Sequence, residues 1–206
     1  MVTVTKKDLV ALGYGNSFAT DIIRLAKIRM VEKGYPFYSS RKLDRVPAEA
    51  VEMGLASYRG AKRRMEYRGS FTTASGASVP LFDDYAHHPP EIRATLSGAK
   101  EMGYKRVWVV FQPHTYSRTA SLYDEFAKSF VGVNAVFAPI YAARETDTLG
   151  ISSEDIVKLL KEKGKEAWYL PTFDEIEKFV MEHCTQGDLL ITMGAGDVVN
   201  VGENLL

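Results

Sequence analysis

The sequence predicts an α/β fold, in which a mostly parallel sheet carries helices on both faces, with a small and mainly helical module before it. Short apolar runs alternate with helical patterns from residue 79 onward, an order typical of βαβ units. Residues 1–48 lack this alternation and hold nine Lys and Arg against four Asp and Glu, whereas the remainder holds 17 against 22. This change predicts two domains, 1–48 and 49–206.

The composition is that of a globular chain. With 206 residues, 46% of them hydrophobic, it can bury one good core and a small appendage. Its formal net charge is zero, which argues against nucleic-acid binding by the chain as a whole. The single cysteine excludes an internal disulfide, and no apolar run is long enough for a membrane span. Since no signal peptide is visible, we expect a soluble, cytoplasmic chain with no membrane partner. We also expect no metal site.

The first module begins with two helical patterns. Thr5 is expected to cap a helix over residues 6–11, which Gly13 ends. Ser17 is expected to cap a second helix over residues 18–32. The module therefore starts as two helices joined by a short turn.

An extended, basic segment follows these helices. Residues 35–38 look extended, and residues 41–47 look like a turn that leads into another helix. This is the order of a small winged helix-turn-helix, and the segment resembles an uncharacterised family of integrative conjugative elements that is similar to excisionase-type DNA-binding modules. The resemblance implies that residues 17–27 are a recognition helix, and that DNA is contacted by Arg24, Lys27, Arg41, Lys42 and Arg45. A basic helical cap with a solvated face is the alternative.

The junction between the domains contains no Gly/Ser-rich linker. Residues 47–55 fit the closing helix of the first module, and residues 50–58 also fit a helix that enters the second domain. A natural fusion, a misassembled gene and an engineered joining all remain open at this point.

The first apolar run of the second domain, residues 79–82, ends in an unusually polar loop. Residues 83–88 include two carboxylates, a phenol and two imidazoles, and a helical pattern follows over residues 91–102. Pro89 and Pro90 suit the first turn of that helix, where a missing N–H costs little. Ligands of open α/β sheets bind at the carboxyl ends of strands, so this loop is a candidate site. A capping loop with incidental histidines is the alternative.

A second apolar run repeats the pattern. Residues 107–111 lead into a loop that carries His114 and Arg118, and a helical pattern follows over residues 122–130. Two polar strand ends make a binding site more credible than one.

The remaining alternation completes a Rossmann-like sheet. A strand over residues 135–140 precedes Arg144 and Glu145, which either contact substrate or pair with each other. The other expected elements are an edge hairpin (64–69 with 70–74), a turn (147–150), a helix from Ser152 or Ser153 to Lys161, a strand (167–170), a helix from Thr172 to His183, a strand (188–193) and a Gly-rich loop (194–197).

The two polar strand ends carry a family resemblance. The stretch DDYAHHP (83–89), followed by FQPHTYSRT (111–119), resembles the C-terminal domain of the Mur ligases, in particular the UDP-N-acetylmuramate–L-alanine ligase type. Three further stretches match in the same order, namely GAKRRM (60–65), IYAARE (140–145) and GAGD (194–197). The resemblance covers about residues 50–206.

The resemblance implies roles for individual side chains. Such ligases activate the carboxylate of UDP-N-acetylmuramate as an acyl phosphate with ATP and Mg, and L-alanine then attacks it. Arg64 would contact the nucleotide and Asp84 its ribose, while Asp83 braces the loop. Substrate contacts would come from Tyr85, His87, His88, His114, Arg118 and Arg144, with the histidines positioning substrate more than acting as bases. Thr115 departs from the family pattern, since many members have Arg there. Substituting Arg64 or Asp84 by alanine would leave the fold intact.

The ATP-binding part of such a ligase has no counterpart in this sequence. A phosphate loop ending in Gly-Lys-Thr/Ser is absent, and Gly13-Tyr14-Gly15 is too short to replace it. ATP and Mg would then be bound only together with a central domain, and the chain would not be catalytically complete alone. Two alternatives remain: a DNA-binding protein of a mobile element with a passenger ligase domain, and a murein-peptide ligase. The QPHTYSRT stretch argues against the last.

Overall fold

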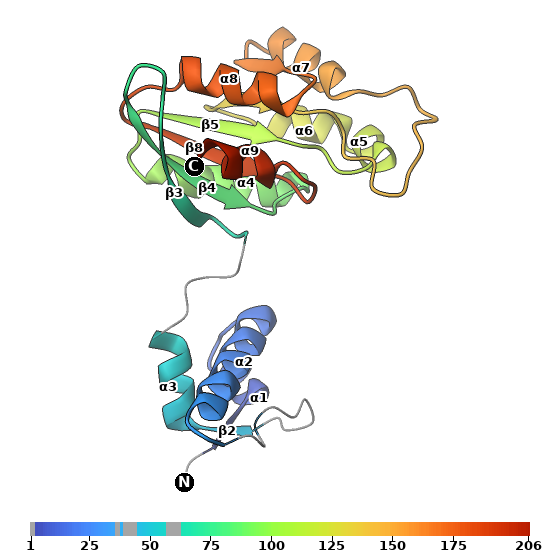
Figure 1. The fold of residues 1–206 in the computed structure, drawn as a ribbon. Coiled ribbons are helices and arrows are strands. Elements are labelled where there is room, and N and C mark those ends of the chain that lie inside the picture. The colour runs from blue at the N-terminus through green and yellow to red at the C-terminus, as the bar shows by residue number, and fades with distance from the viewer. Residues whose placement is uncertain (1–2, 36–37, 39–44, 57–62) are drawn as a thin grey trace. The chain divides into compact units, whose positions relative to one another are not determined.

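The computed structural model describes residues 3–35, 38, 45–56 and 63–206, and it divides the chain into two compact units (Figure 1). The first unit spans Met1–Lys62 and the second spans Arg63–Leu206. The sequence analysis placed the boundary at residue 48. The difference comes from helix α3 (Ala48–Ala56), whose Ala50 and Val51 are buried in the same apolar cluster as Ile22 of helix α2.

The described residues of the first unit form three helices and a two-stranded sheet. Its elements are β1 (Thr3–Thr5), α1 (Lys6–Ala11), α2 (Asn16–Glu32), β2 (Arg45–Pro47) and α3. Thr5 caps α1 as predicted, because its hydroxyl accepts a hydrogen bond from the Asp8 amide while the Asp8 carboxylate accepts one from the Thr5 amide. The predicted cap at Ser17 is wrong, because α2 already begins at Asn16 and follows Gly15, which has no side chain to cap it.

Strand β2 was missed by the sequence analysis, which expected a turn over residues 41–47. Arg45–Pro47 instead pairs antiparallel with Thr3–Thr5. Three-residue strands are too short to show a clear alternation of apolar and polar side chains, and their partner is more than 40 residues away in the chain. Two of the predicted DNA contacts, Arg41 and Lys42, lie outside the described residues.

The second unit is built on a six-stranded sheet, and the predicted mostly parallel α/β architecture is confirmed. The strand order is β3-β4-β8-β5-β6-β7, and every neighbouring pair is parallel except β3 with β4. The strands are β3 (Glu66–Thr72), β4 (Ser78–Asp84), β5 (Arg106–Phe111), β6 (Asn134–Phe137), β7 (Ala167–Tyr169) and β8 (Asp188–Met193). The expected edge hairpin over residues 64–74 is wrong, because one strand, β3, covers most of that stretch and pairs with β4.

Helices cover both faces of this sheet. They are α4 (Pro89–Glu101), α5 (Tyr116–Ser121), α6 (Tyr123–Ser129), α7 (Ser153–Glu162), α8 (Phe173–His183) and α9 (Val199–Leu205). Along β5, Val109 and Phe111 join one buried cluster, which contains apolar residues of α4, α6 and α7. Trp108 and Val110 join the other cluster, with residues of α8 and α9. Successive side chains of a strand point to opposite faces, so β5 is buried on both sides.

Local signals set the starts of several helices. Pro89 and Pro90 occupy the first turn of α4, and Ser152 and Thr172 cap α7 and α8, as the sequence predicted. The helical pattern expected over residues 122–130 begins earlier, and it is divided into α5 and α6 at Leu122. No helix in the described part of the chain is long and apolar enough to cross a bilayer.

Candidate functional site

The carboxyl ends of three neighbouring strands bring the two predicted polar loops together. Strand β8 lies between β4 and β5, with Met193 in register with both Asp84 and Phe111. The Gly194 amide donates to the Asp84 carbonyl at 3.0 Å, and the Gln112 amide donates to the Met193 carbonyl at 3.0 Å. The loops after β4, β5 and β8 therefore adjoin at one edge of the sheet.

A cluster of imidazoles and one guanidinium lies at this edge. The ring centroids of His87 and His114 are 5.7 Å apart, and those of His87 and His88 are 4.9 Å apart. Arg118, one turn into the next helix, places Nη1 3.1 Å from His114 Nδ1. The structure thus joins His87 and His88 of the first loop to His114 and Arg118 of the second, across the end of β8, which lies between β4 and β5.

The hydrogen bonds of the cluster assign its tautomers. A guanidinium can only donate, so His114 Nδ1 accepts from Arg118 and the neutral ring carries its proton on Nε2. A carbonyl can only accept, so His87 Nδ1, 3.0 Å from the Tyr85 carbonyl, carries the proton and leaves Nε2 as an acceptor. His114 therefore offers an imidazole N–H donor, and His87 offers an imidazole acceptor.

Burial is the main reason why both rings favour the neutral form. It lowers the pKa of His87 and of His114 below the ordinary value of 6.5, and the positive charge of Arg118 lowers both further. Both lowered pKa values favour neutral rings for His87 and His114 near pH 7, beside the positive charge of Arg118.

We expect the second unit to lose stability as the pH falls below about 6.5. Because the pKa values of His87 and His114 are lowered in the folded state, the unfolded chain binds protons more readily. Their contribution to stability is complete above the unfolded pKa and is lost as the pH falls through the folded values. Urea midpoints measured between pH 7.5 and 5 will show this loss. A variant with both histidines replaced by glutamine should lose less, and an equal loss would contradict the assignment.

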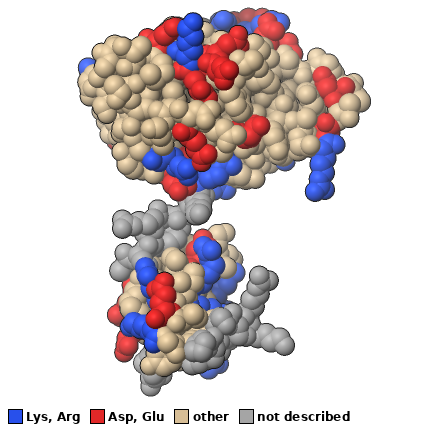
Figure 2. All heavy atoms as spheres, viewed as in Figure 1, with Lys and Arg blue, Asp and Glu red and all other residues tan. Residues whose placement is uncertain are grey.

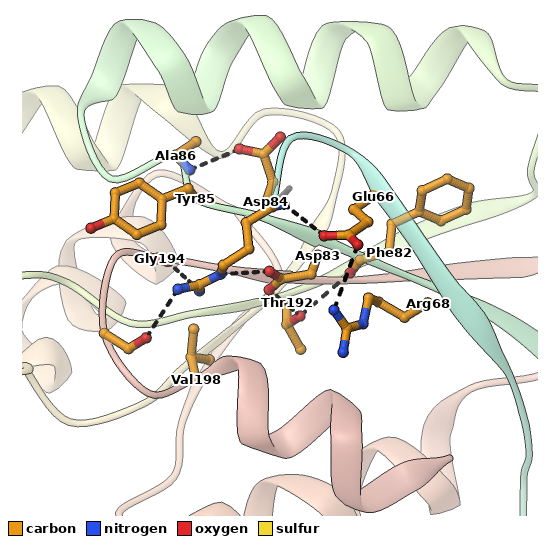
Figure 3. A network of polar contacts seen from close by, with 12 residues as sticks. Glu66, Arg68, Phe82, Asp83, Asp84, Tyr85, Ala86, Thr192, Gly194 and Val198 are labelled. Carbon is orange, nitrogen blue, oxygen red and sulfur yellow. Dashed lines mark hydrogen bonds and ion pairs between the residues drawn. The ribbon is translucent and has the colours of Figure 1, made fainter. Parts of the chain in front are cut away.

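Arg63 connects the first loop to the glycine-rich loop after β8. Its Nε donates to the Asp83 carboxylate at 2.7 Å, and its Nη2 donates to the Gly194 carbonyl at 2.8 Å. The guanidinium also lies 5.0 Å from the centre of the Tyr85 ring. Asp83 is fully buried and accepts a further hydrogen bond from the Thr192 hydroxyl, as expected of a brace (Figure 3). The sequence analysis missed Arg63, whose only signal was its place in GAKRRM.

Asp84, the expected ribose contact, is held by the chain itself. One carboxylate oxygen accepts from the Ala86 amide at 2.7 Å and the other from the Met65 amide at 2.8 Å, and the residue is only 3% exposed (Figure 3). Arg64 has a different environment: its side chain is 48% exposed and lies 3.7 Å from Glu91. Arg64 is therefore open to a ligand, whereas Asp84 occupies a bracing position.

This contrast changes the expected effect of alanine at the two positions. We expect Asp84→Ala to lower the free energy of unfolding by about 1–3 kcal/mol, since the buried Ala86 amide and the partly buried Met65 amide lose their acceptor. Arg64→Ala should change it by less than about 0.5 kcal/mol, because an exposed ion pair contributes little. Urea unfolding of both variants measures the difference, and equal stabilities would restore the sequence-based view that neither residue supports the fold.

The glycine-rich loop packs tightly against the start of the second polar loop. The side-chain amide of Gln112 donates to Asp197 at 2.8 Å and accepts from the Val198 amide at 3.1 Å. A Cβ on Gly196 would overlap the Gln112 oxygen and would lie 2.7 Å from the Tyr141 ring. Only glycine allows this approach, so the loop acts in packing, as the sequence suggested. Gln112 itself was not singled out from the sequence.

The loop after β6 supplies one more of the predicted residues. Glu145 accepts hydrogen bonds from the amide and the hydroxyl of Ser117, while Arg144 next to it is exposed. Glu145 therefore fixes the start of α5, close to the His114 loop. Within the described ranges, no group of three or more His, Cys, Asp or Glu is placed to hold a metal ion.

Comparisons with known proteins place this site in a family. Residues 63–196 match the family described as Mur ligase, glutamate ligase domain, and residues 2–56 match a domain of unknown function, DUF3173. The UDP-N-acetylmuramate–L-alanine ligase of Lachnospira eligens is 53% identical over 169 residues, which cover 82% of this chain and 36% of that protein.

Solved structures agree with this match. UDP-N-acetylmuramate-alanine ligase MurC from Thermotoga maritima is 28% identical with a TM-score of 0.58, over 76% of this chain and 32% of that chain. A folylpolyglutamate synthase/dihydrofolate synthase from Yersinia pestis, complexed with AMPPNP and Mn, shares the fold at 16% identity and a TM-score of 0.51, over 83% of this chain and 36% of that chain. The chain spans about a third of the length of the relatives it matches. Since one family match covers more than half of its residues, the chain belongs to the Mur ligase family, with the glutamate ligase domain in its second unit.

Proposed function

We propose that residues 63–206 form the domain that contacts the amino acid and the nucleotide in an ATP-dependent UDP-N-acetylmuramate–L-alanine ligase of peptidoglycan synthesis. The observation that carries this proposal is the 53% identity to the Lachnospira eligens ligase over 169 residues. The conjunction of His87, His114 and Arg118 at one sheet edge supports it, because these groups are complementary to a zwitterionic amino acid.

The two tautomers suggest how L-alanine is held. Arg118 and the Nε2 proton of His114 are donors for its carboxylate, and the free Nε2 of His87 is an acceptor for a hydrogen of its ammonium group. The amine must lose a proton before it attacks an acyl phosphate. A neutral His87 next to a cation can accept that proton, although its main contribution in our proposal is to orient the amine.

The exposed cations serve the phosphate side of the reaction. Arg64 is an exposed guanidinium beside Glu91 of α4, and it is suited to bidentate contact with a nucleotide phosphate. Arg144 is a second exposed cation on the loop after β6. ATP and Mg belong to the proposal as cofactors of the whole ligase, because this sequence has no Gly-Lys-Thr/Ser phosphate loop. With a UDP-sugar and ATP as substrates, the reaction would take place in the cytoplasm.

A domain exchange tests this function. Residues 63–206 would replace the corresponding part of the Lachnospira eligens ligase, and phosphate release from ATP would be measured with UDP-N-acetylmuramate and L-alanine. We expect activity that requires both substrates, and no turnover from the present chain alone. A folded exchange protein that binds ATP but releases no phosphate with L-alanine would contradict the proposal.

A further inference from the structure

The first unit carries features that the ligase proposal does not use. Helices α1 and α2 are joined by the four residues Leu12–Gly15, and within this turn Gly13 has a φ of +96°, in the left-handed region that favours glycine. The Tyr14 amide closes the turn by donating to the Leu9 carbonyl at 3.2 Å. A turn of this length that contains a glycine is typical of a helix-turn-helix.

Helix α2 has one buried face and one exposed face, which is polar in the first half of the helix. Ala19, Ile22, Ile23 and Ala26 are buried in the core of the first unit. The first half of the helix exposes an amide, two hydroxyls and a guanidinium, from Asn16, Ser17, Thr20 and Arg24. Farther along the same side, Ile28 and Val31 are exposed. The Arg24 side chain is 68% exposed, with Asp21 3.6 Å away, and the Thr20 hydroxyl donates to the Asn16 carbonyl of its own helix. Side chains of these types pair with the edges of bases.

A basic hollow lies beside the start of α1. It has a volume of about 610 Å³ and is lined by Thr3, Thr5, Lys6, Lys7, Asp8 and Arg45. The single carboxylate among them already accepts hydrogen bonds from the amide and the hydroxyl of Thr5. The ammonium groups of Lys6 and Lys7 have no hydrogen-bond or ion-pair partner in the described part of the chain. Three cations around one engaged carboxylate are suited to phosphate groups.

The charge of the chain is divided between its two units. Residues 1–62 hold eleven Lys and Arg against six Asp and Glu, a formal net charge of +5. Residues 63–206 hold 15 against 20, a net charge of −5. On the face of the second unit shown in Figure 2, blue and red side chains lie close together. Because the two net charges have opposite signs, a polyanion is attracted to the first unit and repelled by the second.

We infer that the first unit binds double-stranded DNA, with the exposed face of α2 in the major groove and with Lys6, Lys7 and Arg45 on the phosphates. In helix-turn-helix proteins the second helix enters the major groove while the first crosses the backbone, which matches the positions of the polar face and the basic hollow. An RNA duplex is a poor alternative, because its major groove is too deep and narrow for a helix. This inference does not depend on the ligase proposal.

Binding of the full chain to a fluorescein-labelled, 30-base-pair DNA duplex of random sequence tests the inference, by fluorescence anisotropy. With three cations on phosphates, raising NaCl from 50 to 200 mM should weaken binding about 40-fold. The double variant Lys6→Ala/Lys7→Ala should bind more weakly at 50 mM and lose about two thirds of the salt slope. Alanine favours helices, so α1 should persist, and far-UV circular dichroism checks this.

Two further variants separate binding from folding. Ser17→Glu places a carboxylate near the start of α2, where it stabilises a helix, so weaker DNA binding by this variant would reflect the groove contact and not unfolding. Lys161→Ala/Lys163→Ala removes two exposed cations from the end of α7 in the second unit, and it should bind like the parent. No binding at 50 mM NaCl, or equal loss in the two lysine double variants, would overturn the inference. Equal competition by an RNA duplex of the same sequence would overturn the major-groove contact.

Discussion

Replacing Arg63 by alanine is expected to lower the free energy of unfolding of the second unit by about 3–5 kcal/mol. The reason is the environment of its partner, since the Asp83 side chain is 1% exposed and the Arg63 side chain 22% exposed. Without the guanidinium, a buried carboxylate would keep only the Thr192 hydroxyl as a side-chain donor. The carbonyl of Gly194 would lose its donor from Arg63 as well. A whole domain is stable by about 5–15 kcal/mol, so this loss is large.

Urea unfolding followed by tryptophan fluorescence measures this effect in the intact chain. The chain contains two tryptophans, Trp108 in β5 and Trp168 in β7, and their ring centroids are 5.5 Å apart in the core of the second unit. The signal therefore reports on the second unit alone. Arg68→Ala is a matched control, because Arg68 pairs with the exposed Glu203 at 2.9 Å on the surface of the same unit. We expect this control to lose less than about 1 kcal/mol.

A double variant separates the ion pair from other effects of the substitution. Removing Asp83 together with Arg63 eliminates the buried unpaired charge, so Arg63→Ala/Asp83→Ala should be less destabilised than the sum of the two single variants. Additive losses, or an Arg63→Ala variant as stable as the Arg68→Ala control, would show that the pair does not brace the strand ends.

The polar loops were predictable because their signals are local. Asp83 to His88 follow an apolar run directly, and His114 follows the next one, so the sequence alone places each group at a strand end. Helix starts at Thr5, Ser152 and Thr172 were predictable for the same reason, since a cap and its first turn are adjacent in the chain. Properties that depend on distant segments were not predictable.

Arg63 shows why the rest of the site could not be derived. Its partner Gly194 lies 131 positions away, and they meet only because β8 inserts between β4 and β5. Arg63 also has a φ of +55°, a conformation that no residue pattern announces for arginine. The same holds for Asp84, for which the family resemblance suggests a ribose contact: nothing in the sequence indicates that its carboxylate also accepts hydrogen bonds from the amides of Met65 and Ala86. The roles of the individual site residues therefore stay predictions.

Arg118→Ala should lower kcat/KM for L-alanine about 100- to 1,000-fold in the exchange protein that carries residues 63–206. Arg118 is the positive charge of the imidazole cluster, and its contact with His114 Nδ1 at 3.1 Å also fixes the tautomer that exposes the Nε2 proton. Removing Arg118 therefore takes away its own donors to the L-alanine carboxylate, and it leaves the Nε2 proton of His114 less well fixed. Arg118→Lys should lie between the variant and the parent, because an ammonium keeps the charge but lacks the planar pair of donors.

Arg93→Ala is the matched control for this activity measurement. Arg93 is exposed on α4, and its Nη1 contacts Glu125 at 3.4 Å and the Ser129 hydroxyl at 3.3 Å, both on α6. Its loss should therefore change kcat/KM by less than about twofold. Unfolding curves of all variants separate loss of the amino-acid site from loss of the fold. If Arg118→Ala raises the KM for ATP and leaves that for L-alanine unchanged, the guanidinium serves the nucleotide instead. If it changes neither parameter, the cluster at this sheet edge is not the amino-acid site.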